Sequence, residues 1–342
     1  MTSQRVLIWL PSPLGDAIMA TPALRAFRSH FPDASITFLG PAFTRDILSP
    51  SPFCDNWIDL EKSFWENVAQ LKAGNFDTAI TLKNSFGSAL TLWLGGIGRR
   101  IGYARDGRSL LLTDRIDPLR NDNGTFQPAP MIDYYLKIAE HLGSRTDNRK
   151  TELTVRSEDT EAILEILPQL KSLSGPLVII VPGGTFGPSK LWPIERYAEL
   201  ADALYDAYHA TVILSVAPVK EEVQIAEAIC QRAGSDPINL GTSSLSGGQL
   251  KALYALADLI ITNDTGPRHI AIALNKDIIT LFGPNNPQWT QSGHEKEVQI
   301  IGKAPCVPCD KPICKQSQHL CMESITVEQI FGAAEKILGA KH

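Results

Sequence analysis

The sequence has no long apolar segment near its start and no strong excess of charge of either sign. Within residues 1–24 the apolar pair Trp9-Leu10 runs directly into Pro-Ser-Pro, so we expect neither a signal peptide nor a membrane span. We therefore expect a cytoplasmic protein whose six cysteines are mostly reduced. The formal net charge is −5, whereas nucleic-acid binders are normally more basic, so nucleic acid is not an expected partner.

Several motifs that bind phosphate or metal are also missing. The first turn lacks G-x-G-x-x-G, and Gly96-Ile97-Gly98 has no third glycine at the required spacing, which excludes the usual dinucleotide fingerprint. Gly187 is not followed by Lys, so there is no Walker motif. No Asp-x-Asp pair stands near a candidate loop, because Asp114 and Asp117 are spaced wrongly, and we expect no catalytic metal. The chain also has no internal repeat.

The chain is long enough for two domains, with 342 residues of which 44% are hydrophobic. Short apolar runs alternate with helical patterns in both halves, which is typical of parallel α/β sheets. A charged helix at residues 157–167 and the Ser-Leu-Ser-Gly-Pro segment at 172–176 are interpreted as the linker. We therefore predict a first domain over residues 1–170, a second over 176–325 and a final helix within 326–342.

Residues 259–284 carry the most informative pattern in the chain. Leu259-Ile260-Ile261 reads as a buried strand, a polar turn follows, and Pro267 suits the first turn of a helix. The backbone amides at that helix start, with Gly266 leaving the backbone open, form a natural anion site, and Asp264 and His269 lie on its rim. Two interpretations stay open: Asp264 and Thr265 cap the helix, or Asp264 accepts hydrogen bonds from sugar hydroxyls.

A second candidate loop is rich in glycine. Residues 182–190, Pro-Gly-Gly-Thr-Phe-Gly-Pro-Ser-Lys, follow the predicted strand Leu177–Val181. Glycines allow close backbone approach to a diphosphate, and Lys190 supplies a cation for its charge. Further on, Glu221 follows a strand and could hold a ribose, or it could belong to an ordinary first helical turn.

In the first half, polar residues follow predicted strands in the same way. Asp16 lies between the first strand and the first helix, at the edge where open α/β sheets bind ligands. The alternative is that Asp16 only complements the helix dipole, which contributes about 0.3–1 kcal/mol. Lys83 and Asn84 end another strand, and a run of arginines follows. Such a run is normally a solvated surface, but arginine also binds carboxylate and phosphate bidentately.

Four of the six cysteines gather near the end of the chain. Cys306, Cys309, Cys314 and Cys321 have the spacing C-x2-C-x4-C-x6-C, which is irregular for zinc. We interpret them as a structural cluster that pins the loop before the last helix, with tight thiol packing favoured over zinc.

Four stretches of the sequence resemble the heptosyltransferases of glycosyltransferase family nine, with most likeness to the second heptosyltransferases. They are TNDTGPRHIAIAL followed by LFGP, PSPLGDAIMATPALRAFRSHFPDASITFL, LKNSFGSALTLWLGGIGRRIGYARDGRSLLL and PGGTFGPSKLWPIERYAEL. The resemblance implies a GT-B fold, with an N-terminal acceptor domain and a C-terminal nucleotide-sugar domain, both Rossmann-like, facing a central cleft. In this fold the final helix often crosses back to the first domain.

The resemblance also implies an activity: transfer of heptose from ADP-heptose to an inner-core sugar of lipopolysaccharide, with anomeric inversion and no further cofactor. Asp16 matches the family's proposed general base, and Lys190 matches its diphosphate-contacting lysine. The predicted donor-binding residues are Thr185, Lys190, Glu221, Asp264, Thr265, Gly266 and His269, and the predicted acceptor-binding residues are Ser12, Lys83, Asn84, Arg99 and Arg100. Because the acceptor is a lipid, we expect peripheral attachment to the inner leaflet of the inner membrane. Two alternatives stay open: a nucleotide-sugar epimerase and a non-catalytic sugar-nucleotide binding module.

Overall fold

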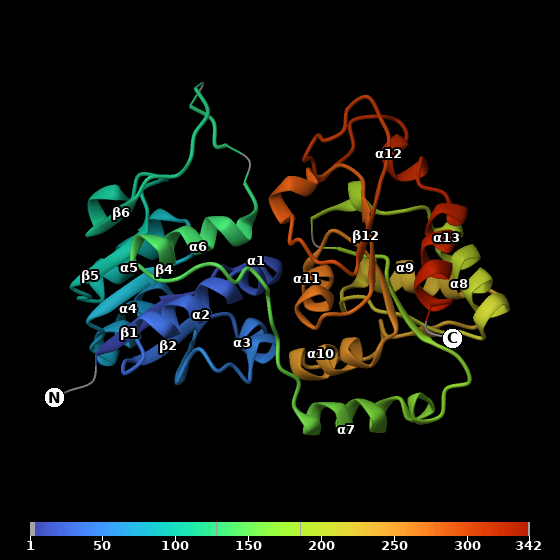
Figure 1. The fold of residues 1–342 in the computed structure, drawn as a ribbon, viewed down its shortest axis with the longest axis horizontal. Helices are drawn as coiled ribbons and strands as arrows, with labels where there is room; N and C mark the ends of the chain where they lie inside the picture. The colour runs from blue at the N-terminus through green and yellow to red at the C-terminus, as the bar shows by residue number, and fades with distance from the viewer. Residues whose placement is uncertain (1–3, 123, 128, 185, 341–342) are drawn as a thin grey trace. The chain divides into compact units, whose positions relative to one another are not determined.

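The computed structural model describes residues 4–122, 124–127, 129–184 and 186–340 (Figure 1). The chain divides into two compact units, Met1–Thr154 and Val155–His342. Each unit is built on one six-stranded parallel sheet. Across the described ranges, no helix combines the length and the apolar character that crossing a membrane requires.

The first unit has the sheet order β3-β2-β1-β4-β5-β6. Its strands are β1 (Arg5–Trp9), β2 (Ser35–Gly40), β3 (Asn56–Asp59), β4 (Thr78–Thr81), β5 (Arg99–Tyr103) and β6 (Asp114–Ile116). Its helices are α1 (Leu14–Met19), α2 (Thr21–His30), α3 (Ala42–Leu48), α4 (Phe64–Gly74), α5 (Phe86–Leu94), the 3-10 turn η1 (Ser109–Leu111) and α6 (Met131–His141). The apolar strand β1 lies in the middle of the sheet, paired with both β2 and β4.

The second unit repeats this plan with the order β12-β11-β10-β7-β8-β9. Its strands are β7 (Leu177–Val181), β8 (Thr211–Leu214), β9 (Ile238–Asn239), β10 (Leu259–Asn263), β11 (Ile278–Phe282) and β12 (Glu297–Ile301). Its helices are α7 (Ser157–Ile166), α8 (Ile194–Tyr208), α9 (Lys220–Cys230), α10 (Gly247–Leu256), α11 (Gly266–Ala273), α12 (Leu320–Glu323) and α13 (Val327–Leu338), with 3-10 turns η2 (Pro168–Lys171), η3 (Pro188–Lys190) and η4 (Pro287–Thr290).

Both units are doubly wound, which confirms the predicted pair of Rossmann-like domains. In each sheet the strand order reverses between two central neighbours: β1 and β4 in the first unit, β7 and β10 in the second. All five residues of β7 and of β10 are buried, as expected for parallel strands covered on both faces. Ligands of open α/β sheets bind outside the carboxyl ends of strands at this reversal. The fold therefore directs attention to the loops that follow these four strands.

The limits of the units differ from the expected ones in two respects. We expected the first domain to extend to residue 170, but the division falls after Thr154 because α7 packs on α10 of the second unit. In the fold that the resemblance implies, the final helix often crosses back to the first domain. Instead, α13 packs on α8 and on strands β10, β11 and β12, as Figure 1 shows for the α8 contact. Its apolar side chains Ile330, Ala334 and Leu338 are fully buried in the core of the second unit, and this burial fixes the helix there.

Candidate functional site

The turn between β10 and α11 brings several charged groups together inside the second unit. Thr265 occupies the N-cap of α11 in an extended conformation, but its side chain makes no capping hydrogen bond. Asp264 is 6% exposed, and its carboxylate lies 3.0 Å from Arg268 Nη1 and 3.8 Å from Lys190 Nζ. Asp264 is therefore paired with two cations, and the capping interpretation does not describe what these side chains do.

Lys190 joins the glycine-rich loop to this turn. It ends η3, is buried, and donates a hydrogen bond from Nζ to the backbone carbonyl of Asp264. Its ammonium also lies 4.6 Å from the ring centre of Phe186. Burial lowers the pKa of Lys190, and the charge of Asp264 opposes this shift. The two predicted donor loops, 74 residues apart in sequence, thus meet at one buried cation.

The glycine-rich loop itself packs tightly against its neighbours. A Cβ added at Gly184 would lie 2.4 Å from Thr265 Cγ2. Only glycine at position 184 therefore lets the backbone of the loop come this close to the turn before α11. Gly187 has a φ of +144°, and a Cβ there would lie 2.5 Å from the carbonyl oxygen of Pro312. Thr185, a predicted donor-binding residue, lies outside the described residues.

Of the two glutamates that begin α9, Glu222 is the one that reaches the glycine-rich loop. Its Oε2 accepts a hydrogen bond of 2.8 Å from the Ala217 amide, and a Cβ at Gly183 would lie 2.5 Å from it. The predicted ribose-binding residue, Glu221, is exposed at the first turn of α9. Glu221 and Glu222 are adjacent in the sequence. Only the orientation of the first turn of α9 in the structure shows that Glu222, and not Glu221, points toward the glycine-rich loop.

His269 follows Arg268 on α11 and is buried. Burial lowers its pKa to about 4, and the positive charge of Arg268 adds to this effect. His269 is therefore a neutral imidazole at pH 7, with one nitrogen that donates and one that accepts a hydrogen bond.

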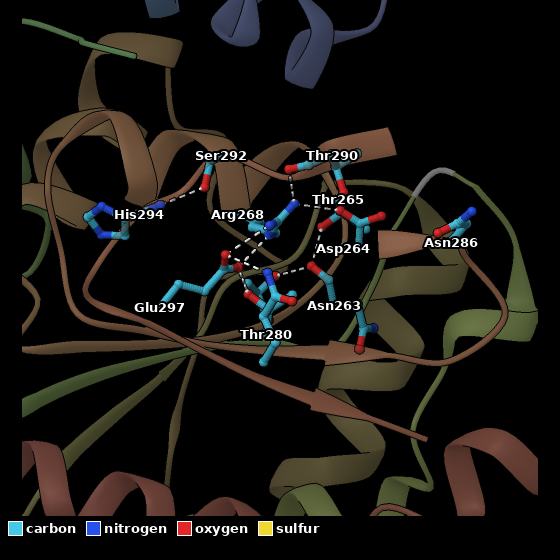
Figure 2. A network of polar contacts seen from close by, with 12 residues as sticks. Asn263, Asp264, Thr265, Arg268, Thr280, Asn286, Thr290, Ser292, His294 and Glu297 are labelled. Carbon is cyan, nitrogen blue, oxygen red and sulfur yellow. Dashed lines mark hydrogen bonds and ion pairs between the residues drawn. The ribbon is translucent and has the colours of Figure 1, made fainter. Parts of the chain in front are cut away.

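Arg268 and Glu297 complete the network, and neither was identified from the sequence (Figure 2). Arg268 is fully buried and forms a bidentate pair with Glu297, with Nε–Oε1 at 2.6 Å and Nη2–Oε2 at 2.9 Å. The i,i+4 spacing of Asp264 and Arg268 at a helix start could have indicated their contact. Nothing in the local sequence links Arg268 to Glu297.

The segment that contains the four cysteines contacts the same loops. Ser189 donates from its backbone amide to the Pro312 carbonyl at 3.2 Å and from its hydroxyl to the Lys311 carbonyl at 2.6 Å. The amide of Cys309 donates to the Pro284 carbonyl at 2.9 Å. Burial raises the pKa of the Cys321 thiol, and the charges of Cys306, Cys314 and Cys309 add to this shift. Among the described residues, no three His, Cys, Asp or Glu side chains form a group that could hold a metal ion.

In the first unit, Asp16 follows the central strand β1, at the carboxyl edge of the sheet. It lies in the first turn of α1 and is half-buried, while Ser12 on the preceding loop is exposed. Burial is the main cause of the strongly raised pKa of Tyr135 on α6, and the negative charge of Asp16 raises this pKa further. Helices α1 and α6, which carry these two residues, pack against each other.

Lys83 and Asn84 follow β4, the neighbour of β1, and thus lie at the same edge as Asp16. Lys83 Nζ lies 5.9 Å from the ring centre of Trp9, and burial lowers the pKa of Lys83. The fully buried Arg108 holds this loop: it donates to the Lys83 carbonyl and, at 2.7 Å, to Asn84 Oδ1. One of the predicted basic-surface arginines is therefore a structural residue in the core.

Arg99 and Arg100 lie at the opposite edge of the sheet, so the structure does not bring them together with Asp16 and Lys83 as we expected. They begin β5, and Arg99 is in register with Thr78 at the start of β4. Four residues at about 3.3 Å each separate Arg99 from the carboxyl end of its strand. Arg99 pairs with Asp114 at 2.6 Å, and Arg100 donates to the Leu111 carbonyl at 2.7 Å, so their guanidinium groups are engaged within the unit.

Two arginines of this run follow β5, and because Arg108 is fully buried, the one that is half-buried at the carboxyl edge is Arg105. Its guanidinium lies 4.1 Å from the ring centre of Phe126, and that of Arg120 lies 4.4 Å from the same ring. Two cations thus lie against one aromatic side chain. The basic composition of the run was visible in the sequence, but the strand direction decides which arginine reaches this edge.

Comparisons with known proteins agree with this architecture. The family described as "Glycosyltransferase family 9 (heptosyltransferase)" matches residues 65–319. The chain is 30% identical over 316 residues to lipopolysaccharide heptosyltransferase 2 of Escherichia coli K12, covering 84% of each chain. It is 29% identical over 313 residues to lipooligosaccharide heptosyltransferase 2 of Haemophilus influenzae, covering 86% of this chain and 88% of that one. The solved structure of E. coli ADP-heptose lps heptosyltransferase II superposes with a TM-score of 0.82 at 25% identity, over 99% of both chains, which confirms the GT-B fold.

Proposed function

The chain belongs to glycosyltransferase family 9, the heptosyltransferases, and we propose that it moves heptose from ADP-heptose to an inner-core sugar of lipopolysaccharide. Family membership makes the chain a glycosyltransferase, which argues against both the epimerase and the non-catalytic module. The names of its relatives, which are lipopolysaccharide and lipooligosaccharide heptosyltransferases, support the substrate class. The observation that carries the proposal is the buried Lys190 beside Asp264, at the strand reversal of the second unit.

In this proposal the second unit binds the nucleotide sugar. Lys190 and the amides that begin α11 at Gly266 bind the diphosphate, because a lysine ammonium and a helix N-terminus both favour negative charge. Asp264, Thr265 and the neutral His269 hold the sugar by hydrogen bonds. Glu222 takes the ribose-binding role proposed for Glu221, since it is the glutamate that lies against the glycine-rich loop. Thr185 is kept as a proposed donor contact from its match to the family pattern.

The proposed chemistry is a single displacement with inversion. The acceptor oxygen forms a bond to the anomeric carbon while the bond from that carbon to the diphosphate breaks and ADP leaves with the electron pair. Asp16 takes the proton of the attacking hydroxyl, since a sugar hydroxyl is too weak an acid to attack unaided at pH 7. Lys190 stabilises the charge that develops on the departing diphosphate. The proposal includes no cofactor besides the ADP-sugar itself.

The first unit is proposed to bind the acceptor at the edge that carries Asp16. Ser12, Lys83 and Asn84 are the predicted contacts at this edge, and Arg105 replaces Arg99 and Arg100 as the cation for acidic groups of the core. Because the acceptor is lipid-linked, we propose that the protein acts in the cytoplasm, attached peripherally to the inner leaflet of the inner membrane.

Two large apolar side chains support a lipid partner. Trp65 and Phe86 follow the carboxyl ends of β3 and β4 respectively, and they are 69% and 50% exposed. Such residues beside lysine and arginine are typical of surfaces that contact anionic lipid.

The test is a transfer assay. Purified protein is incubated with ADP-heptose and a panel of truncated core acceptors, and the products are weighed by mass spectrometry. We expect one acceptor to gain the mass of one heptose, with the opposite anomeric configuration to the donor by NMR. No transfer to any core acceptor would contradict the proposed substrate, and retention of configuration would contradict the single displacement.

A further inference from the structure

We propose that Arg268 and Glu297 are a positioning pair for the donor site: they anchor the Asp264 carboxylate, so that Lys190 stays available to the donor's diphosphate. The inference rests on the proposed function and goes further, because it gives different tasks to the two cations that lie against Asp264. Arg268 holds the turn without contacting the donor, whereas Lys190 contacts the donor.

The hydrogen bonds of Arg268 show why it does not reach a ligand. Its Nε and Nη2 are taken by the two oxygens of Glu297, and its Nη1 is shared between Asp264 Oδ1 and the Thr290 carbonyl, both at 3.0 Å (Figure 2). The side chain is 0% exposed. All three nitrogens of the planar fork are therefore engaged inside the protein, in a geometry that fixes the position of each partner.

Glu297 is held as firmly as the arginine that it binds. Its side chain is 3% exposed, and its oxygens accept hydrogen bonds from Thr280 Oγ1 at 2.6 Å and Gln299 Nε2 at 2.9 Å. Burial raises the pKa of Glu297, but the hydrogen bond and the charge of Arg268 outweigh burial and lower it. The pair thus connects α11 to β11 and β12 through an ionised carboxylate.

Lys190 differs from Arg268 in reach and in flexibility. Its Nζ lies 3.8 Å from Asp264 Oδ2, a looser ion pair than the 3.0 Å contact of Arg268 with Oδ1. A lysine ammonium is a point charge on a flexible stem, so it can turn toward an incoming anion. If Arg268 were absent, Lys190 would be the remaining partner of the buried Asp264 carboxylate, and the cost of leaving that carboxylate unpaired would hold Lys190 on it.

The test uses a double variant that removes both members of the pair. Arg268→Met with Glu297→Leu replaces a buried ion pair by apolar side chains, a change that often leaves stability unaltered or increased. We expect a melting temperature near that of the wild type and a Kd for ADP, by calorimetry, weaker by about 10- to 100-fold, the range typical when outer partners of binding groups at metal sites are removed. A control in the first unit is Arg25→Met with Glu152→Met, which removes another arginine–glutamate pair; Arg25 holds the Glu152 carboxylate and two backbone carbonyls. The control should leave ADP affinity unchanged.

A double-mutant cycle with Lys190→Ala distinguishes positioning from packing. In the wild-type background this substitution should weaken ADP binding strongly. In the Arg268→Met, Glu297→Leu background it should have little further effect, because Lys190 is then already held by Asp264. Equal effects in both backgrounds would overturn the proposed division of tasks.

The outcomes separate this inference from the proposed function. If the wild type fails to bind ADP, the proposed donor site is wrong. If the wild type and the folded double variant bind ADP equally, the positioning inference is overturned while the donor site stands. If the double variant does not fold, Glu297→Gln decides, since it keeps the shape and removes the charge: a folded variant with weakened ADP binding supports the inference, and unchanged binding contradicts it.

Discussion

Replacing Lys190 by methionine should weaken ADP binding without destabilising the fold. The change removes the ammonium and keeps a stem of similar length, so it leaves no large cavity beside Phe186. The binding loss is that of one charge-assisted hydrogen bond, about 1.5–3 kcal/mol, or about 10- to 140-fold in Kd. The fold should tolerate the change for two reasons: burial already disfavours the charged lysine, as its lowered pKa shows, and Asp264 keeps Arg268 as a partner.

Isothermal calorimetry with ADP measures the binding, and thermal unfolding measures the stability. Lys276→Met is the matched control: Lys276 also donates to a backbone carbonyl, that of Ala255 at 2.9 Å, but it follows the far end of α11. We expect its Kd to equal that of the wild type. If Lys190→Met bound ADP as tightly as the wild type at an unchanged melting temperature, Lys190 would not contact the diphosphate and the donor assignment would fail.

Four further predictions follow from the same geometry. Asp16→Asn should lower kcat by about 10²–10⁴ while ADP affinity and melting temperature stay near wild type; loss of stability together with activity would show a structural role instead. Arg105→Ala should raise the acceptor KM and Arg99→Ala should not, and the reverse result in steady-state kinetics would restore the original assignment. Because the pKa of His269 is lowered in the folded protein to about 4, its protonation favours the unfolded chain, so the free energy of unfolding should fall as pH decreases from about 6.5 to 4. Urea unfolding at pH 7 and pH 5 should show a smaller loss in His269→Gln than in the wild type. Finally, metal analysis of protein purified without a His-tag should find substoichiometric zinc in the cysteine cluster, and one zinc per chain would replace thiol packing with a metal clip.

Several features of this protein followed from the sequence alone because they depend on neighbouring residues. The apolar run at Leu177–Val181 is a strand with those same bounds in the structure. Pro267 lies in the first turn of α11, as its lack of an N–H predicted. Alternation of strands and helices was enough to predict parallel sheets, since this periodicity is local, whereas the pair of Rossmann-like domains was implied by the family resemblance.

Other features depended on contacts between distant parts of the chain, and only the tertiary structure decided them. Arg99 and Arg105 belong to one basic run, yet the direction of β5 places them at opposite edges of the sheet. Arg268 and Glu297 lie 29 residues apart, and pairing of β11 with β12 is what brings the glutamate to the helix. The final helix packs where its apolar side is buried most completely, which a pattern of residues cannot specify. Local sequence patterns determine which helices and strands form. Strand order and packing determine which charged side chains come into contact, and the candidate site is made of contacts between residues that are distant in sequence.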